Sequence, residues 1–223
     1  MHIGLIGDIG PAATDFYSRR LITTFAGANT PRELTLVHAD ALTLLRHLAA
    51  NHAKPQVASY QRLTRRLASA GADYDVVTSI AGRFCIGNFT AESPLPVVDR
   101  LAEVSRVVER RDLLRIGMLG TRTVMESRFY GGITSAEIIP PDGPELEAVH
   151  EAYVSMATSG FVTDPQRSVF TAASRRLITE HGAEAIMLRG TDLARAFNEQ
   201  TAGFPLVDCA PIHVDAITRL AKL

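Results

Sequence analysis

The sequence is short of the features that mark several large classes of protein. Its two cysteines, Cys85 and Cys209, stand far apart without the His or Cys spacing of a metal site, which excludes a disulfide framework and a zinc site. His47 and His52 do not share a helix face and have no carboxylate pattern beside them, so no metal is expected. Neither a GxGxxG motif nor a Walker loop occurs, and the sequence therefore indicates no nucleotide cofactor.

Long apolar runs and an excess of charge are also missing. No run approaches the length of a membrane-spanning helix, and the first residues resemble a strand rather than a secretion signal, so we expect a cytoplasmic protein without a membrane partner. The net charge of −1 disfavours nucleic acid as a partner. With 46% hydrophobic and 21% charged residues, 223 residues suffice for one two-lobed unit or two small domains.

The most informative stretch is the opening one, residues 1–17 (MHIGLIGDIGPAATDFY). An apolar strand breaks at Gly7 and passes through Asp8 and Gly10 into a helix-like segment, which is typical of the β–loop–α corner of an open α/β sheet. The glycines let the backbone approach a ligand, and the start of the helix favours a carboxylate or phosphate. The alternative is an ordinary tight turn between a strand and a helix.

A second corner follows half a chain later. Residues 116–120 (IGMLG) repeat the pattern of residues 3–7 (IGLIG), and a helix-like segment again follows. The repetition predicts two similar α/β halves whose strand ends face each other across a cleft.

Strands and helices are expected to alternate throughout, which predicts a mostly parallel sheet flanked by helices in each half. The expected helices lie at 12–27, 41–53, 55–71, 97–110, 121–130, 146–159, 165–181 and 212–220, and the further strands at 34–37, 75–80, 136–139, 185–188 and 205–208. The segment Thr163-Asp164-Pro165 is a clear helix start, and the prolines between 140 and 144 indicate a rigid surface turn.

The two corners resemble motifs of the aspartate/glutamate racemase family, whose members use no pyridoxal phosphate. IGLIGDIGPAATDFY is similar to its IGLIGGMGPAATxxFY opening, and GMLGTRTVMESRFY to its GLLGTRxTMExxFY segment. Weaker similarities follow at GADYDVVTSIAGR, HGAEAIMLRGTDL and PLVDCAPIH. The resemblance implies two pseudo-symmetric lobes, residues 1–97 plus 208–223 and residues 98–207, with the closing segment returning to the first lobe.

In that family two cysteines, one from each lobe, exchange a proton with the α-carbon of the substrate. The resemblance places the first of them at Ser79 or Thr78 and the second at Gly190, so this chain resembles a divergent member without either catalytic cysteine. The family's His and Asn in the first motif are replaced by Arg83 and Ile80. Asp192 matches the family's Glu, and His213 matches a histidine of the closing segment.

Asp192 and His213 are therefore the best candidates for a general base. Arg83 and Arg189, expected at the mouth of the cleft, would clamp a substrate carboxylate or instead form an ion pair with Asp8. The predicted catalytic residues are Asp192, His213, Ser79 and Thr78. The predicted substrate-binding residues are Gly7, Asp8, Gly10, Ile80, Ala81, Arg83, Gly120, Thr121, Arg122, Arg189, Gly190 and Thr191.

The function expected first is a cofactor-independent isomerase, lyase, decarboxylase or hydrolase. It would act next to the carboxylate of a small, amino or non-amino, dicarboxylic acid with acid/base groups other than two thiols. Two alternatives stay open: a carboxylate-binding homologue without turnover, and a racemase that has recruited Asp192, His213 or Cys85. Packing in the core is the commoner role for a lone cysteine such as Cys85 or Cys209. Relatives often form homodimers, and the sequence leaves the oligomeric state open.

Overall fold

The computed structural model divides the chain into two compact units. The first unit is Met1–Asp99 with His213–Leu223, and the second is Arg100–Ile212. The structure describes residues 1–7, 11–27, 31–79, 84–128, 131–191, 193–197 and 202–220. Each unit is an α/β body with a parallel sheet flanked by helices, as the alternation of strands and helices predicted.

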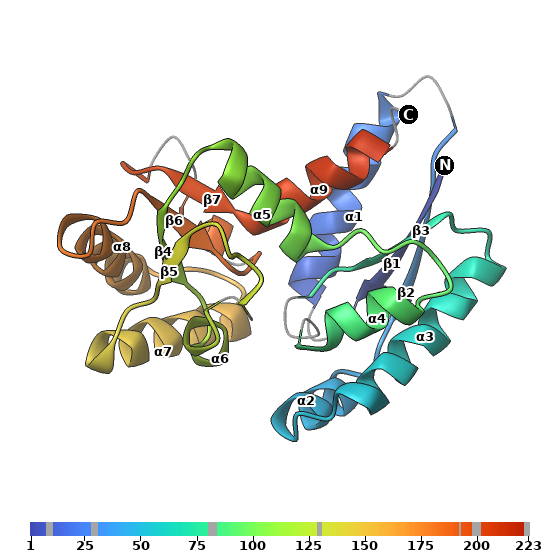
Figure 1. Cartoon of the computed structure of the whole chain (residues 1–223), viewed down its shortest axis with the longest axis horizontal. Helices are drawn as coiled ribbons and strands as arrows, with labels where there is room; N and C mark the ends of the chain where they lie inside the picture. Colours follow the sequence, from blue (N-terminus) through green and yellow to red (C-terminus); the bar gives the residue numbers. More distant parts are fainter. Residues whose placement is uncertain are drawn as a thin grey trace. The chain divides into compact units, whose positions relative to one another are not determined.

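The first unit is built on a parallel sheet with the strand order β2-β1-β3. Its strands are β1 (His2–Gly7), β2 (Glu33–His38) and β3 (Tyr74–Val77), and its helices are α1 (Pro11–Ala26), α2 (Ala41–Ala49), α3 (Ala53–Ser69) and α4 (Ile86–Glu92). The chain moves from β1 to β2 and then back across β1 to β3. Because such crossovers are right-handed, α1 and α3 cover opposite faces of the sheet, as Figure 1 shows.

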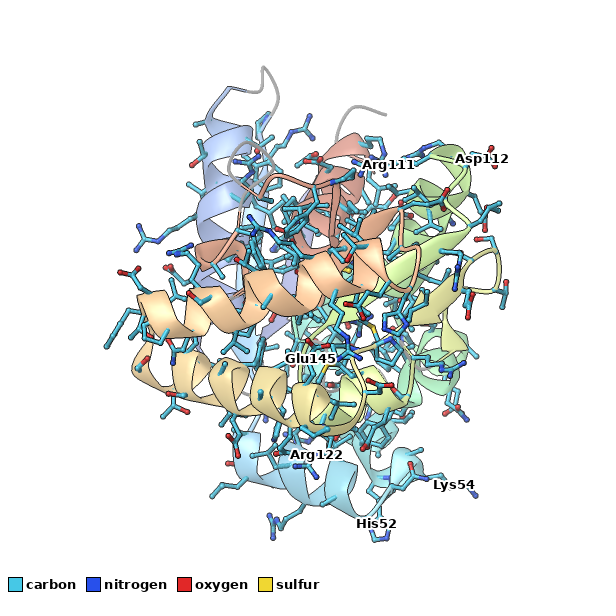
Figure 2. The ribbon with its side chains drawn as sticks, turned by 90° about the vertical axis from the view of Figure 1, so that its left-hand side faces the viewer. His52, Lys54, Arg111, Asp112, Arg122 and Glu145 are labelled. Atoms are coloured by element: carbon cyan, nitrogen blue, oxygen red, sulfur yellow. The ribbon has the colours of Figure 1, made fainter. Side chains whose placement is uncertain are left out.

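The second unit has a parallel sheet with the order β5-β4-β6-β7. Its strands are β4 (Arg115–Leu119), β5 (Glu137–Ile139), β6 (Ala185–Leu188) and β7 (Leu206–Asp208). Its helices are α5 (Arg100–Arg110), α6 (Arg122–Glu126), α7 (Gly143–Ser159) and α8 (Asp164–Thr179), with a 3-10 turn η3 (Leu193–Arg195). The last helix, α9 (Cys209–Leu220), starts in this unit and ends in the first. The helices α7 and α8 lie side by side in both views (Figures 1 and 2).

The two halves predicted from the repeated pentapeptide are confirmed. Both sheets place the second strand, the first strand and the third strand in the same order, and Gly4 of β1 corresponds to Gly117 of β4. A Cβ atom at Gly4 would lie 2.8 Å from Leu67 Cδ1, and one at Gly117 would lie 3.1 Å from Leu177 Cβ. In each unit the central strand therefore carries a glycine where the crossover helix, α3 or α8, packs closely on the sheet.

Several predicted boundaries were wrong for local reasons. The helix expected over 121–130 is the short α6, which ends at Glu126, and residues 129–130 lie outside the described residues. The helix α4 was not expected at all. The proline-rich turn at 140–144 is partly helical, because α7 begins at Gly143 and proline is tolerated in a first helical turn. Over the described part of the chain, no helix combines the length and apolar character needed to cross a membrane.

Candidate functional site

Nine of the predicted site residues lie at the carboxyl ends of strands, three in the first unit and six in the second. Gly7 ends β1, while Thr78 and Ser79 follow β3 in the first unit. In the second unit the residues follow β4 and β6: Gly120, Thr121, Arg122, Arg189, Gly190 and Thr191. Six others lie outside the described residues: Asp8, Gly10, Ile80, Ala81, Arg83 and Asp192. The cleft expected between the two units stays a prediction.

Thr78 fastens β3 to the central strand of the first unit. Its backbone N–H donates to the carbonyl oxygen of Ile6 at 3.0 Å, and its hydroxyl donates to the same oxygen at 3.1 Å. The side chain is 1% exposed. Ser79, the next residue, is only half-buried, so it is the more accessible of the two hydroxyls at this strand end.

Gly7 is enclosed by side chains from α1 and β2. A Cβ atom there would lie 2.5 Å from the Thr14 hydroxyl oxygen and 2.8 Å from Cδ2 of the His38 ring, so only glycine fits without a shift. The exposed His38 shares a 2.8 Å hydrogen bond between its Nδ1 and the carbonyl oxygen of Ala39. Because a carbonyl only accepts, Nδ1 carries a proton, and Nε2 is the ring nitrogen that lies beside Gly7.

His213 is completely buried in the first unit, with hydrogen bonds at both ring nitrogens. Its Nε2 lies 2.7 Å from the carbonyl oxygen of Val98, and its Nδ1 lies 2.7 Å from the hydroxyl oxygen of Tyr17. The carbonyl can only accept, so Nε2 carries the proton and, in the neutral ring, Nδ1 accepts from the Tyr17 hydroxyl. These bonds tie α9 to α1 and to the segment before α5. The role of His213 as a general base stays a prediction.

The two loops of the second unit touch at the strand ends. The backbone N–H of Arg189 donates to the carbonyl oxygen of Leu119 at 3.3 Å, and a Cβ atom at Gly120 would lie 3.2 Å from Arg189 Cβ. Arg189 is 1% exposed, so its guanidinium is buried. A buried guanidinium is costly unless it is paired. The expected place of Arg189 at the mouth of a cleft stays a prediction.

Arg122 interacts with α7. Its backbone N–H donates to Nδ1 of His150 at 3.2 Å, and its guanidinium forms hydrogen bonds with both carboxylate oxygens of Glu147, the longer at 2.6 Å. Figure 2 shows the labelled Arg122 side chain next to this helix. With Glu147 as its partner, Arg122 contributes to the corner by attaching it to α7.

A second residue of α7, Tyr153, reaches the same corner. A Cβ atom at Gly190 would lie closest to the Tyr153 hydroxyl oxygen, 2.8 Å from Cζ and 2.9 Å from Cε2 of that ring. Real Cβ atoms do not approach other atoms so closely, so a side chain at residue 190 would require the Tyr153 ring to shift. Sequence reasoning missed Tyr153. Its position on an expected helix was visible, but nothing in the sequence linked it to residue 190.

Neither cysteine is exposed at these strand ends. Cys85 precedes α4 and is 0% exposed, and Cys209 begins α9 and is 1% exposed. Burial of this kind is the usual fate of a cysteine that serves packing. No group of three or more His, Cys, Asp or Glu side chains suited to a metal ion occurs among the residues that the structure describes.

The fold and these strand-end corners define a family. A model of the Asp/Glu/hydantoin racemase family matches residues 6–217, and the chain belongs to this family.

Solved structures with the same fold include a putative Asp/Glu racemase from Yersinia pestis, with 24% identity and a TM-score of 0.88 over 100% of this chain and 99% of that one. An aspartate racemase homologue from Pyrococcus horikoshii OT3 has 18% identity and a TM-score of 0.83 over 100% and 99%. An allantoin racemase from Klebsiella pneumoniae has 14% identity and a TM-score of 0.61 over 100% and 88%. These structures support the two-lobed α/β fold and leave the substrate open.

Proposed function

We propose that the protein is a cofactor-independent enzyme that acts next to the carboxylate of a small, amino or non-amino, dicarboxylic acid. In this proposal its acid/base groups are not two thiols. The observation that carries it is the pair of residues at the third strand ends, Ser79 and Gly190, where the family resemblance expects the two cysteines. Cys85 and Cys209 are both buried elsewhere, which argues against a simple relocation of the thiols.

The strand-end corners have the chemistry that such a reaction needs. Removing a proton next to a carboxylate places negative charge on the carbon and on the carboxylate oxygens, and fixed donors stabilise that charge. The accessible hydroxyl of Ser79 and the hydroxyls of Thr121 and Thr191 are suitable donors, and Arg189 supplies a positive charge. Isomerisation, elimination and decarboxylation all pass through charge of this kind, so the proposal names the common step rather than one product.

A second candidate is a protein that binds the same acids without turning them over. The observation that favours it is His213, whose two ring nitrogens are both engaged in hydrogen bonds inside the core. If no other group serves as a base, the strand-end corners can still bind a carboxylate through their hydrogen-bond donors. The protein then cannot transfer a proton to or from the bound acid.

Exchange of the α-hydrogen in heavy water separates the candidates. The purified protein is incubated with aspartate, glutamate or malate, and loss of the α-proton signal is followed by nuclear magnetic resonance, with affinity measured by calorimetry. The enzyme proposal expects exchange for at least one acid, with the rate reduced in Ser79→Ala. Binding of an acid without exchange, and with the acid itself chemically unchanged, would establish the second candidate instead.

Alkylation supplies the control for thiol chemistry. Treatment with iodoacetamide under native conditions is expected to leave the exchange rate unchanged, because Cys85 and Cys209 are 0% and 1% exposed. Loss of exchange in step with modification of Cys85 would return the proposal to a racemase with a recruited thiol. Conversion of one enantiomer to the other, followed by chiral chromatography, then distinguishes racemisation from other outcomes.

Assembly as a homodimer is also a proposal. Leu36 of β2 and Leu42 and Leu45 of α2 are large apolar side chains with 41%, 70% and 43% exposure, all in the first unit. Sedimentation at several protein concentrations measures the assembly, and a constant monomer mass would rule the dimer out.

A further inference from the structure

We propose that the Tyr153 hydroxyl supplies, in the second unit, the acid/base group that position 190 lacks. The inference rests on the proposed function, because it names one of the groups that carry out the proton transfer. Its starting point is the contact between Tyr153 and Gly190, which brings the hydroxyl from α7 to the end of β6.

The contact makes the two positions interdependent. A side chain at residue 190 would begin with a Cβ atom 2.8 Å from Cζ and 2.9 Å from Cε2 of Tyr153, with the hydroxyl oxygen nearer still. A cysteine at 190 and this placement of Tyr153 therefore exclude each other. The space that a residue-190 side chain would enter is instead occupied by a hydroxyl group, which can itself donate and accept a proton.

Tyr153 is held in place by its neighbours on α7. Val149, one turn before it, and Met156, nearly one turn after it, are both 0% exposed and anchor the helix in the core. The same helix is attached to the corner after β4 by the bond from Arg122 N–H to His150 and by the Arg122–Glu147 pair. Tyr153 is only half-buried, so part of the residue stays accessible to solvent.

The proposed step is a simple proton transfer. The phenol of Tyr153 first loses its own proton to the solvent. The resulting phenolate oxygen then takes the proton from the carbon beside the substrate carboxylate, so that the C–H bond breaks and an O–H bond forms. The electron pair of the C–H bond passes into the carboxylate, where the donors of the strand ends stabilise it. In the return step the phenol gives the proton, or a deuteron acquired from the solvent, back to that carbon.

Tyr153→Phe tests the role directly, because it removes one oxygen atom and keeps the ring beside Gly190. The α-hydrogen exchange rate with aspartate, glutamate or malate should fall by about 10²- to 10⁴-fold, the usual contribution of a general acid or base. Affinity for the same acid should change by less than about tenfold, as expected for loss of one neutral hydrogen bond. The matched control is Tyr74→Phe in β3 of the first unit, which should exchange at the wild-type rate.

A second pair of variants asks whether a thiol can replace the phenol. Tyr153→Ala makes room at residue 190, and Gly190→Cys in that background restores a sulfur at the strand end. Exchange lost in Tyr153→Ala should be partly recovered in the double variant and should then be abolished by iodoacetamide. Its pH dependence should move to lower pH, because thiols ionise at lower pH than phenols. Gly190→Cys with Tyr153 intact should not make the exchange sensitive to iodoacetamide, because the cysteine and tyrosine side chains collide.

Incorporation of 3,5-difluorotyrosine at position 153 covers the case in which these variants do not fold. It preserves the shape of the side chain and makes the phenol more acidic, so the pH profile of exchange should shift to lower pH. An unshifted profile would overturn the assignment.

The remaining outcomes are also decisive. Exchange in Tyr153→Phe within about threefold of wild type, far below the contribution of a general base, would overturn the Tyr153 assignment and leave the proposed function standing. A loss of affinity as large as the loss of rate would make Tyr153 a binding group and overturn its acid/base role. Absence of exchange in the wild type with every acid would overturn both proposals.

Discussion

The two units follow one plan and differ in the helix that comes after their second strand. In the first unit α2 has 9 residues, whereas its counterpart α7 in the second unit has 17. The strand ends differ as well, because Ser79 follows β3 with a side chain and Gly190 follows β6 without one. The longer helix brings Tyr153 to the strand end that lacks a side chain. At equivalent strand ends of the two units, the side chain therefore comes from different elements: from the residue after the strand in the first unit and from α7 in the second.

Other features are the same in both units. Gly4 and Gly117 admit the crossover helices α3 and α8. A carboxylate before each third strand accepts hydrogen bonds from the start of the first strand: Asp73 from the N–H of His2 at 2.7 Å, and Glu184 from the N–H of Arg115 at 2.9 Å. The two units therefore share the glycine of the central strand and the carboxylate before the third strand. They differ in the side chains at the strand ends.

The largest expected effect on stability concerns His213, whose hydrogen bonds join α9 to the rest of the first unit. His213→Ala removes two buried hydrogen bonds, to Tyr17 and Val98, and leaves a ring-sized space, so it should lower the free energy of unfolding by about 2–5 kcal/mol. Tyr17→Phe removes only one of these bonds and should cost about 1 kcal/mol. Urea unfolding followed by circular dichroism measures both. Equal losses in the two variants would show that the ring of His213 contributes nothing beyond its bond to Tyr17.

The next prediction tests whether Gly4 and Gly117 play the same role, which is to let a helix pack closely on the central strand of each sheet. Gly4→Ala places a Cβ atom 3.1 Å from the carbonyl oxygen of Tyr74, and Gly117→Ala places one 2.6 Å from Ile186 Cδ1. Each change overpacks a sheet–helix interface and should cost about 1–3 kcal/mol in urea unfolding.

Gly87→Ala is the control for this pair. Gly87 lies exposed in α4 with open space around its Cβ position, so alanine should stabilise the protein by about 0.5–1 kcal/mol through helix propensity. A neutral Gly4→Ala beside a costly Gly117→Ala would break the proposed equivalence of the two central strands.

Much of this common frame is predictable from the sequence. Gly7, which ends β1, and Gly120, which follows β4, come after short apolar runs, and the alternation of strands with helices predicts parallel sheets. The helix start at Thr163 was also readable, because a capping residue followed by Asp and Pro is a local signal that needs no tertiary contact.

The contents of the corners were not predictable, because they depend on which side chains approach one another in three dimensions. Tyr153 and Gly190 are separated by two elements, α8 and β6, and only the packing of α7 brings them together. The pairing of His213 with Val98 and Tyr17 likewise joins residues that are remote in sequence. Arg122 was predicted to bind substrate from its position in a motif, and that prediction is untested. The motif gave no sign that Glu147 pairs with this arginine.

A smaller effect is expected at the N-termini of the crossover helices. Thr163 caps α8 through a reciprocal capping box with Gln166, whereas His52, at the equivalent end of α3, makes no side-chain cap. Thr163→Ala should therefore lower the free energy of unfolding by about 1 kcal/mol. His52→Ala should change it by less than about 0.5 kcal/mol in the same urea titration. A cost at His52 as large as that at Thr163 would remove this difference between the units.

The smallest effect is a pH dependence at Glu184, the carboxylate before the third strand of the second unit. Backbone hydrogen bonds from Arg115 and Leu114 lower the pKa of the exposed Glu184 carboxyl below its ordinary value of 4.5. A lowered pKa in the folded state means that the charged form stabilises the protein above about pH 4.5 and that this contribution is lost as the pH falls through the folded pKa. Wild type should therefore be more stable than Glu184→Gln at pH 7, and the difference should narrow towards pH 3 in parallel urea titrations.

Asp73→Asn should lower the free energy of unfolding at pH 7 by less than Glu184→Gln does, because the Asp73 carboxylate accepts one backbone hydrogen bond and the Glu184 carboxylate accepts two. A constant difference between wild type and Glu184→Gln across this range would show that the carboxylate acts through its shape alone.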